Sequence, residues 1–214
     1  MKHCQTPTPP STWRRRWTTY LFALTGACLA ILPQGLYAYD NLSSAVPDAI
    51  KVPAGHRPFL RGDAVGTQNY ICLPSVSSVS GVAWTLVGPQ ATLFNSSGAQ
   101  IITHFFSLNP EEESIARATW QDSRDTSAVW ARLKQEDATV VVQPGAIPWL
   151  LLKVVGAVSG STGGERLTET TYIQRVRTTG GLAPATGCGE ASNVGAREFV
   201  PYTADYIFYK ATGE

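Results

Sequence analysis

The stretch VAWTLVGPQATLF, residues 82–94, shows the pattern that decides the fold. Two short runs of valine, tryptophan, threonine, leucine and phenylalanine lie on either side of Gly88-Pro89. Runs rich in β-branched and aromatic residues and bounded by glycine or proline are typical of β-strands. The stretch therefore predicts two strands, Val82–Val87 and Ala91–Phe94.

The same pattern recurs at intervals of roughly ten residues through the rest of the chain. It predicts seven further strands, which are Thr67–Leu73, Ile101–Phe106, Ala128–Leu133, Thr139–Gln143, Trp149–Val155, Thr168–Thr178 and Tyr202–Lys210. No alternation of strands with long amphipathic helices is present, which argues against a doubly wound nucleotide-binding fold. The chain is predicted to be all-β, as a single-domain antiparallel β-sandwich with a β-barrel as the alternative.

Polar segments between these runs predict turns and loops. Asn109–Glu113 fits one helical turn, because asparagine caps helices, proline suits the first helical position and acids favour the positive end of the dipole. Its three glutamates are expected to face solvent. Gly156–Gly164 is predicted to be a hairpin loop, because it lacks the lysine and the spacing of a phosphate-binding loop. Thr179–Asn193 is predicted to be a long loop.

The first 38 residues have the composition of a secretory signal peptide. Three arginines, Arg14–Arg16, precede an apolar run, Tyr20–Leu32, which Pro33 ends, and the small residue Ala38 offers a cleavage site. The run is shorter than the roughly 20 residues that a membrane-spanning helix needs. We therefore expect an exported protein, periplasmic or extracellular, from which residues 1–38 are removed.

Two other interpretations of this leader stay open. Arg15-Arg16 could belong to a twin-arginine signal, although the flanking residues fit poorly. Cys28 could be a lipidation site, although the apolar run continues past it. After the leader we expect a loosely ordered arm over residues 39–53 and one all-β domain over residues 54–214.

Composition limits the partners of the mature chain. The sequence has 17 basic and 16 acidic side chains, and four of the basic ones lie in the leader. The mature chain therefore has 13 basic and 16 acidic side chains, which gives a net charge near −3. Nucleic acid is therefore not an expected partner, because its binders carry a clustered basic surface. No later segment has the length of a membrane span, and no motif calls for a cofactor.

Cys72 and Cys188 are the cysteines that remain after the leader is removed. Two thiols of a small exported domain pair most simply with each other. The bridge would contribute roughly 4–5 kcal/mol through the entropy of the unfolded chain, less if its geometry is strained. A metal site would need further ligands at short spacing, and none lie near either cysteine.

The mature chain has two histidines, His56 in a predicted loop and His104 on a predicted strand. With one carboxylate they could bind a transition metal. An enzyme, a hydrolase or a metal-dependent one, could use either histidine with a nearby acid such as Asp63 or Asp205. The simpler interpretation is that His104 is a hydrogen-bonded core residue and His56 a structural contact of its loop.

Four tryptophans can fill a core or line a sugar-binding surface. Trp84 and Trp149 lie within apolar runs and are expected in the core. Trp120 and Trp130 flank the polar turn Asp122–Ser127 and are expected to be partly exposed.

Two pairs of polar residues lie inside predicted strands. Gln68-Asn69 and Gln174-Arg175 each occupy adjacent positions, so one member of each pair must face inward. A buried amide or guanidinium without a partner costs about 1–3 kcal/mol. They form either an internal hydrogen-bond network or the polar end of a ligand pocket.

Several ordered motifs are similar to one family. They are GTQNYIC (66–72), VAWTLVGPQATLF (82–94), THF (103–105), TWQDSRDTSAVWA (119–131), IPWLLL (147–152), TYIQRVRTTGGLAP (171–184), GC (187–188) and VPYTADYIFY (200–209). Together they resemble the domain of unknown function 3455 family of exported bacterial and fungal proteins, with a departure at Phe106–Ala118. The resemblance implies export and one domain holding both cysteines, and it supplies no activity or catalytic residue. A dehydrogenase label carried by some members has no support here, because no dinucleotide fingerprint is present.

The function these features favour is a non-catalytic exported binding module for a carbohydrate or another cell-envelope polymer. Its candidate ligand-binding residues are His56, Gln68, Asn69, His104, Trp120, Gln174 and Arg175. The alternatives are the enzyme described above and a structural envelope or stress protein, and fold by analogy does not decide among them.

Overall fold

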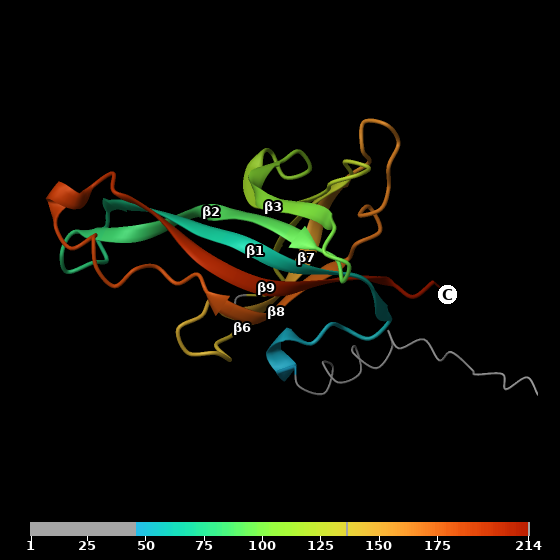
Figure 1. Ribbon diagram of the computed structural model, residues 1–214, viewed down its shortest axis with the longest axis horizontal. Coiled ribbons are helices and arrows are strands. Elements are labelled where there is room, and N and C mark those ends of the chain that lie inside the picture. The colour runs from blue at the N-terminus through green and yellow to red at the C-terminus, as the bar shows by residue number, and fades with distance from the viewer. Residues whose placement is uncertain (1–45, 136, 214) are drawn as a thin grey trace, which may run out of the picture. The chain divides into compact units, whose positions relative to one another are not determined.

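The computed structural model describes residues 46–135 and 137–213, which form nine strands and two short 3-10 helices (Figure 1). The helices are η1 (Asp48–Ile50) and η2 (Ala191–Asn193). The strands are β1 (His56–Pro74), β2 (Val82–Phe94), β3 (Gln100–Asn109), β4 (Ile115–Asp122), β5 (Ala128–Leu133), β6 (Thr139–Val140), β7 (Trp149–Val158), β8 (Tyr172–Gly180) and β9 (Arg197–Ala211). The predicted leader and residues 39–45 of the predicted arm lie outside the described residues.

Eight of these strands close into an antiparallel barrel. Strands β1 to β5 pair in order, β5 pairs with β7, β7 with β8 and β8 with β9, and β9 pairs with β1 to complete the ring. The short β6 adds to β7 outside the ring. The all-β antiparallel prediction is confirmed in the form of its barrel alternative, because the β5–β7 pairing leaves no free sheet edge and therefore no second sheet to pack as a sandwich.

Strands β1, β2 and β9 continue beyond the barrel as a three-stranded ribbon, to the left in Figure 1. Residues 82–88 of β2 pair with β1 alone. The two strands predicted on either side of Gly88-Pro89 are therefore one strand, with a register shift between Asn69 and Tyr70 at this point. Gly88 has a φ of 149°, and a Cβ there would lie 3.0 Å from the Phe106 ring. Glycine at this position forms a bulge in the strand rather than a turn between strands.

The predicted disulfide between Cys72 and Cys188 is present, with the two Cα atoms 5.5 Å apart. It joins the ribbon to the long loop between β8 and β9. Trp84 lies over the same loop, and its Nε1 donates a hydrogen bond to the Thr186 carbonyl at 3.0 Å. Trp84 is half-buried, so its predicted place in the core is wrong. The aromatic side chain covers a loop of the ribbon instead.

The segment Asn109–Glu113 is a hairpin turn, so the predicted helical turn is wrong. Glu113 and the next residue, Ser114, have φ values of 50° and 63°, which lie in the left-handed region. Strand β4, which follows, was not predicted. The fully buried Asn109 accepts a hydrogen bond from the Glu111 backbone N–H at 3.1 Å. This bond shapes a turn in place of a helix start.

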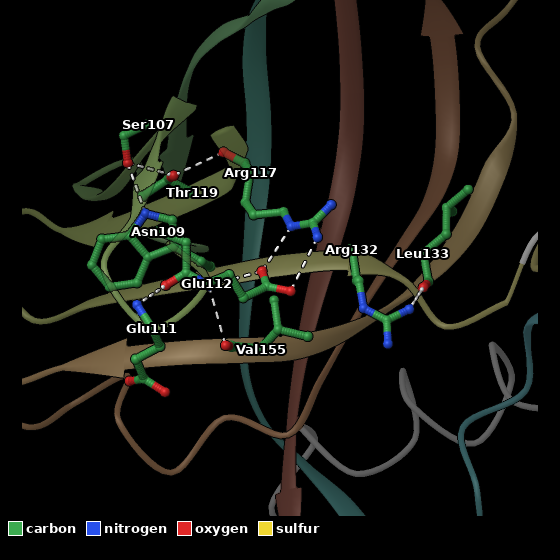
Figure 2. Close-up of polar contacts among 10 residues, drawn as sticks. Ser107, Asn109, Glu111, Glu112, Arg117, Thr119, Arg132, Leu133 and Val155 are labelled. Atoms are coloured by element: carbon green, nitrogen blue, oxygen red, sulfur yellow. Dashed lines mark hydrogen bonds and ion pairs between the residues drawn. The ribbon is translucent and has the colours of Figure 1, made fainter. Parts of the chain in front are cut away.

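Glu111 and Glu113 are exposed as expected, but Glu111 and Glu112 also accept hydrogen bonds from the barrel wall (Figure 2). Glu112 accepts two hydrogen bonds from Arg117, at 2.8 and 3.0 Å. Asn109 Nδ2 donates to the Val155 carbonyl on β7 at 3.2 Å, and Glu111 accepts from the Ala157 backbone N–H at 3.0 Å. Val155 lies at the register shift between β5 and β7, and Ala157 lies two residues beyond it. The turn therefore supplies hydrogen bonds where the strand ladder is interrupted.

The half of the barrel away from the ribbon is filled by side chains. The buried residues Leu93, Ile102, Val129, Ile173 and Phe208 lie on the inner faces of five different strands and belong to one hydrophobic cluster. A layer of this kind closes that half of the interior.

The N-terminal residues that the structure describes pack on the outside of the barrel. Ile50 of η1 is fully buried, and its carbonyl accepts a hydrogen bond from Gln174 Nε2 at 2.7 Å. Within residues 46–135 and 137–213, no helix is long and apolar enough to cross a membrane.

Candidate functional site

The barrel holds a cavity of about 330 Å³ in the half that faces the ribbon, and the cavity opens to the surface beside the exposed Leu86 and Phe106. Most of its lining is apolar, and all nine strands contribute to it. The lining residues are Gln68, Leu86, Pro89, His104, Phe106, Ala118, Trp120, Leu133, Thr139, Pro148, Leu150, Leu152, Arg175 and Tyr206. Four of the seven predicted ligand-binding residues are among them. A mainly apolar interior with a few polar groups is typical of a small-molecule site.

Gln68 places an unpaired amide in this cavity. Its side chain is 3% exposed, and the amide has no hydrogen-bond partner among the described residues. The neighbouring Asn69 faces the outer side of β1, where its Oδ1 accepts a hydrogen bond from the Thr67 hydroxyl at 2.7 Å. The amide nitrogen and oxygen remain accessible from the cavity, because neither belongs to the fully enclosed unpaired side-chain atoms of the described residues. The inner face of β1 therefore presents a donor and an acceptor that the protein leaves available.

Arg175 is the charged residue of the lining. Its Nε and Nη2 atoms donate to the Pro148 carbonyl, at 3.1 and 2.9 Å. Pro148 immediately precedes β7, so these bonds hold the guanidinium at the end of the barrel where β7 begins. The preceding residue, Gln174, faces outward and binds Ile50 and Tyr209.

His104 lines the cavity beside Trp120. Its Nδ1 carries the proton, because it donates to the Thr119 carbonyl at 2.8 Å. The pKa of His104 is lowered from 6.5 to about 3, mainly by burial and to a smaller extent by the Arg175 charge, while the Thr119 bond opposes the shift. The ring is therefore neutral near neutral pH, and its Nε2 is a hydrogen-bond acceptor.

The expected partial exposure of Trp120 and Trp130 is wrong. Trp120 is fully buried in the barrel interior, and its Nε1 has no partner among the described residues. Trp130 is 8% exposed, and its Nε1 donates to the Ser107 hydroxyl at 2.8 Å. The polar turn between them does not indicate exposure, because its carboxylates bind the turn itself and Arg166. Asp122 Oδ1 accepts the backbone N–H of Arg124 at 2.8 Å, and Asp122 Oδ2 lies 3.3 Å from Arg166 Nη1. Trp149 is buried as expected.

The structure does not bring the two histidines together. His56 lies at the first position of β1, where its Nδ1 lies 3.1 Å from the Pro53 carbonyl. His104 lies opposite Ala91, which lies opposite Gly66 of β1. Ten residues of extended strand separate Gly66 from His56, a span of about 30 Å.

The two acids proposed to assist a histidine lie on the outer face of the barrel wall, where Asp63 is exposed and Asp205 is buried. Asp63 and Asp205 pair across β1 and β9, and Arg61 Nη2 contacts them at 2.9 and 3.1 Å. Burial raises the pKa of Asp205, which Arg61 and Arg177 oppose. His104 and Asp205 thus lie on opposite sides of the barrel wall. No group of three histidine, cysteine or acidic residues suited to a metal occurs in the part of the chain that the structure describes.

Several lining residues were not predicted. Tyr206 shares the inner face of β9 with Tyr202 and Phe208, so strand alternation could have identified it. Thr139 and Pro148 reach the cavity from the segment around β6, and no local pattern indicates that contact.

These features define a closed antiparallel barrel with an interior cavity of ligand size. The family model described as protein of unknown function (DUF3455) matches residues 53–210, so the chain belongs to this family. No curated protein and no solved structure matches the chain.

Proposed function

We propose that the protein is an exported barrel that binds one small, mainly apolar ligand in its cavity. The observation that carries this proposal is the unpaired amide of Gln68, which is buried yet lines the cavity. A ligand with a polar group would supply the missing hydrogen bonds, while its apolar part would contact residues such as Phe106 and Leu150.

The geometry favours a small ligand over a carbohydrate polymer. The interior of an eight-stranded barrel is wide enough for side chains or for one small ligand. A polymer would need an open strip of aromatic rings. Trp120, Trp130 and Trp149 are buried, and the half-buried Trp84 binds the Thr186 carbonyl of its own loop. A saccharide therefore serves as a comparison ligand in the test below.

Two features support export. The leader pattern of residues 1–38 is typical of a secretory signal peptide. The Cys72–Cys188 disulfide is typical of proteins of oxidising compartments.

A binding function is favoured over a hydrolase because of what lines the cavity. The lining has one histidine and no aspartate, glutamate, cysteine, serine or lysine. His104 thus lacks the carboxylate that would orient it as a general base.

Fluorescence of the neutral probe phenylnaphthylamine tests the proposal. The oxidised protein should bind the probe with increased emission, and Ala118→Phe, which fills the cavity, should weaken binding at least tenfold. Ala211→Phe is the matched control, because Ala211 is exposed at the opposite end of the barrel. Binding that Ala118→Phe leaves unchanged, or displacement of the probe by soluble oligosaccharides alone, would contradict the proposal.

A further inference from the structure

The barrel interior holds a positive charge that no acid neutralises. Arg175 lines the cavity, and it forms no ion pair with any carboxylate of residues 46–135 and 137–213. Four other arginines of these residues do pair with aspartate or glutamate. A guanidinium stays charged at any physiological pH. Arg175 is partly buried, and a charge that is partly shielded from water without an acidic partner is one that a negatively charged ligand would stabilise.

Arg175 also has hydrogen-bond donors that no protein group uses. A guanidinium has five N–H donors, and the Pro148 carbonyl accepts two of them, from Nε and Nη2. These two bonds hold the group in place and leave three N–H donors without a partner among the described residues. A fixed guanidinium with free donors is suited to a carboxylate, whose two oxygens match its planar fork.

We propose that the cavity selects a monocarboxylate with an apolar body, and that Arg175 binds the carboxylate. This inference rests on the proposed function and names the ligand class of the same cavity. One cation and no acid in the lining match a single negative charge. A phosphate monoester carries up to two charges near neutral pH, so it would leave excess negative charge in an apolar interior.

The other polar groups of the cavity fit this ligand. His104 stays neutral, because burial holds its pKa at about 3. It therefore adds no second positive charge. Gln68 can donate from its amide nitrogen to the same carboxylate or to another acceptor of the ligand. The apolar body would contact Phe106, Trp120 and Leu150.

Displacement of phenylnaphthylamine tests the ligand class with three competitors of similar shape: naphthoate, naphthamide and naphthyl phosphate. In the wild-type protein, naphthoate should displace the probe at least tenfold more strongly than the neutral amide and more strongly than the phosphate. This preference should disappear in Arg175→Gln. It should persist in Arg132→Gln, which removes the same charge from an exposed position on β5.

A second variant covers the case in which Arg175→Gln does not fold. Gln68→Glu keeps the side-chain shape and adds a negative charge to the cavity lining, so it should abolish the preference for naphthoate while the neutral probe still binds. Equal displacement by naphthoate and naphthamide, a stronger effect of the phosphate, or a preference that survives both variants would overturn the inference. Such results leave the proposed function intact, whereas failure of phenylnaphthylamine to bind the wild-type cavity contradicts the proposed function itself.

Discussion

The imidazole of His104 stacks on the indole of Trp120, with ring centroids 4.1 Å apart and ring planes 11° apart. The two residues face each other across β3 and β4, and Tyr206 of β9 meets both rings edge-on. The rings form the aromatic wall of the cavity. A charged imidazolium in this position would lose its hydration without gaining an acid as a partner, which is why the ring is neutral.

The neutral state of His104 predicts how stability depends on pH. The pKa of His104 is lowered from 6.5 to about 3 in the folded protein. The unfolded chain therefore takes up a proton as the pH falls below about 6.5, and the folded protein does not. The free energy of unfolding should fall with decreasing pH by up to about 1.4 kcal/mol per unit from this residue.

Urea unfolding at pH 7 and pH 5 measures this effect, and His104→Gln is the control that cannot titrate. Between pH 7 and pH 5, the free energy of unfolding of the wild-type protein should fall by about 2 kcal/mol more than that of the variant. An equal loss in both proteins would show that other groups cause the pH dependence.

Reduction of the Cys72–Cys188 bridge should lower stability without removing the cavity. The two cysteines are separated by 116 residues, so the chain-entropy model gives an upper value of about 4–5 kcal/mol. The bridge lies on the ribbon, and neither cysteine lines the cavity. Urea unfolding with and without a reductant should show the loss, whereas phenylnaphthylamine affinity at low urea should stay within about twofold. A large loss of affinity on reduction would show that the shape of the cavity depends on the ribbon.

Asn109→Ala should destabilise the closure of the barrel between β5 and β7. The fully buried Asn109 donates to the Val155 carbonyl and to Glu112, and it accepts from the Glu111 backbone. Its removal leaves buried groups unpaired, at a cost of about 1–3 kcal/mol. Glu113→Gln is the control, because this exposed residue belongs to the same turn. Equal urea midpoints for both variants would contradict a structural role for the turn.

The sequence predicts the strands well where β-branched and aromatic residues are dense, as in Ile101–Phe106 and Trp149–Val155. It misses β4, whose sequence IARATWQD contains two alanines and polar residues that are uncommon in strands. It also cannot reveal that β5 pairs with β7, because strand closure depends on contacts that no local pattern encodes.

In the candidate site, too, local patterns predict some features and long-range contacts decide the others. Strand alternation requires that one residue of Gln174-Arg175 face inward, and the structure shows that it is Arg175. Which inward residues share a cavity depends on the register of strands far apart in sequence. That register brings Gln68, His104 and Arg175 together and leaves His56 about 30 Å away along β1.

Gly88→Ala should disturb both stability and the cavity. Gly88 has a φ of 149°, and a Cβ there would lie 3.0 Å from the ring of Phe106, which lines the cavity. Gly81→Ala is the matched control, because Gly81 also has a positive φ, 73°, and nothing lies within 4 Å of its Cβ position. In the control, the free energy of unfolding should fall by about 1 kcal/mol from backbone strain alone. In Gly88→Ala it should fall further, because the alanine must also displace the Phe106 ring. Of the two variants, only Gly88→Ala should change phenylnaphthylamine affinity, by about threefold or more. Equal effects of the two variants on that affinity would show that Phe106 does not shape the cavity.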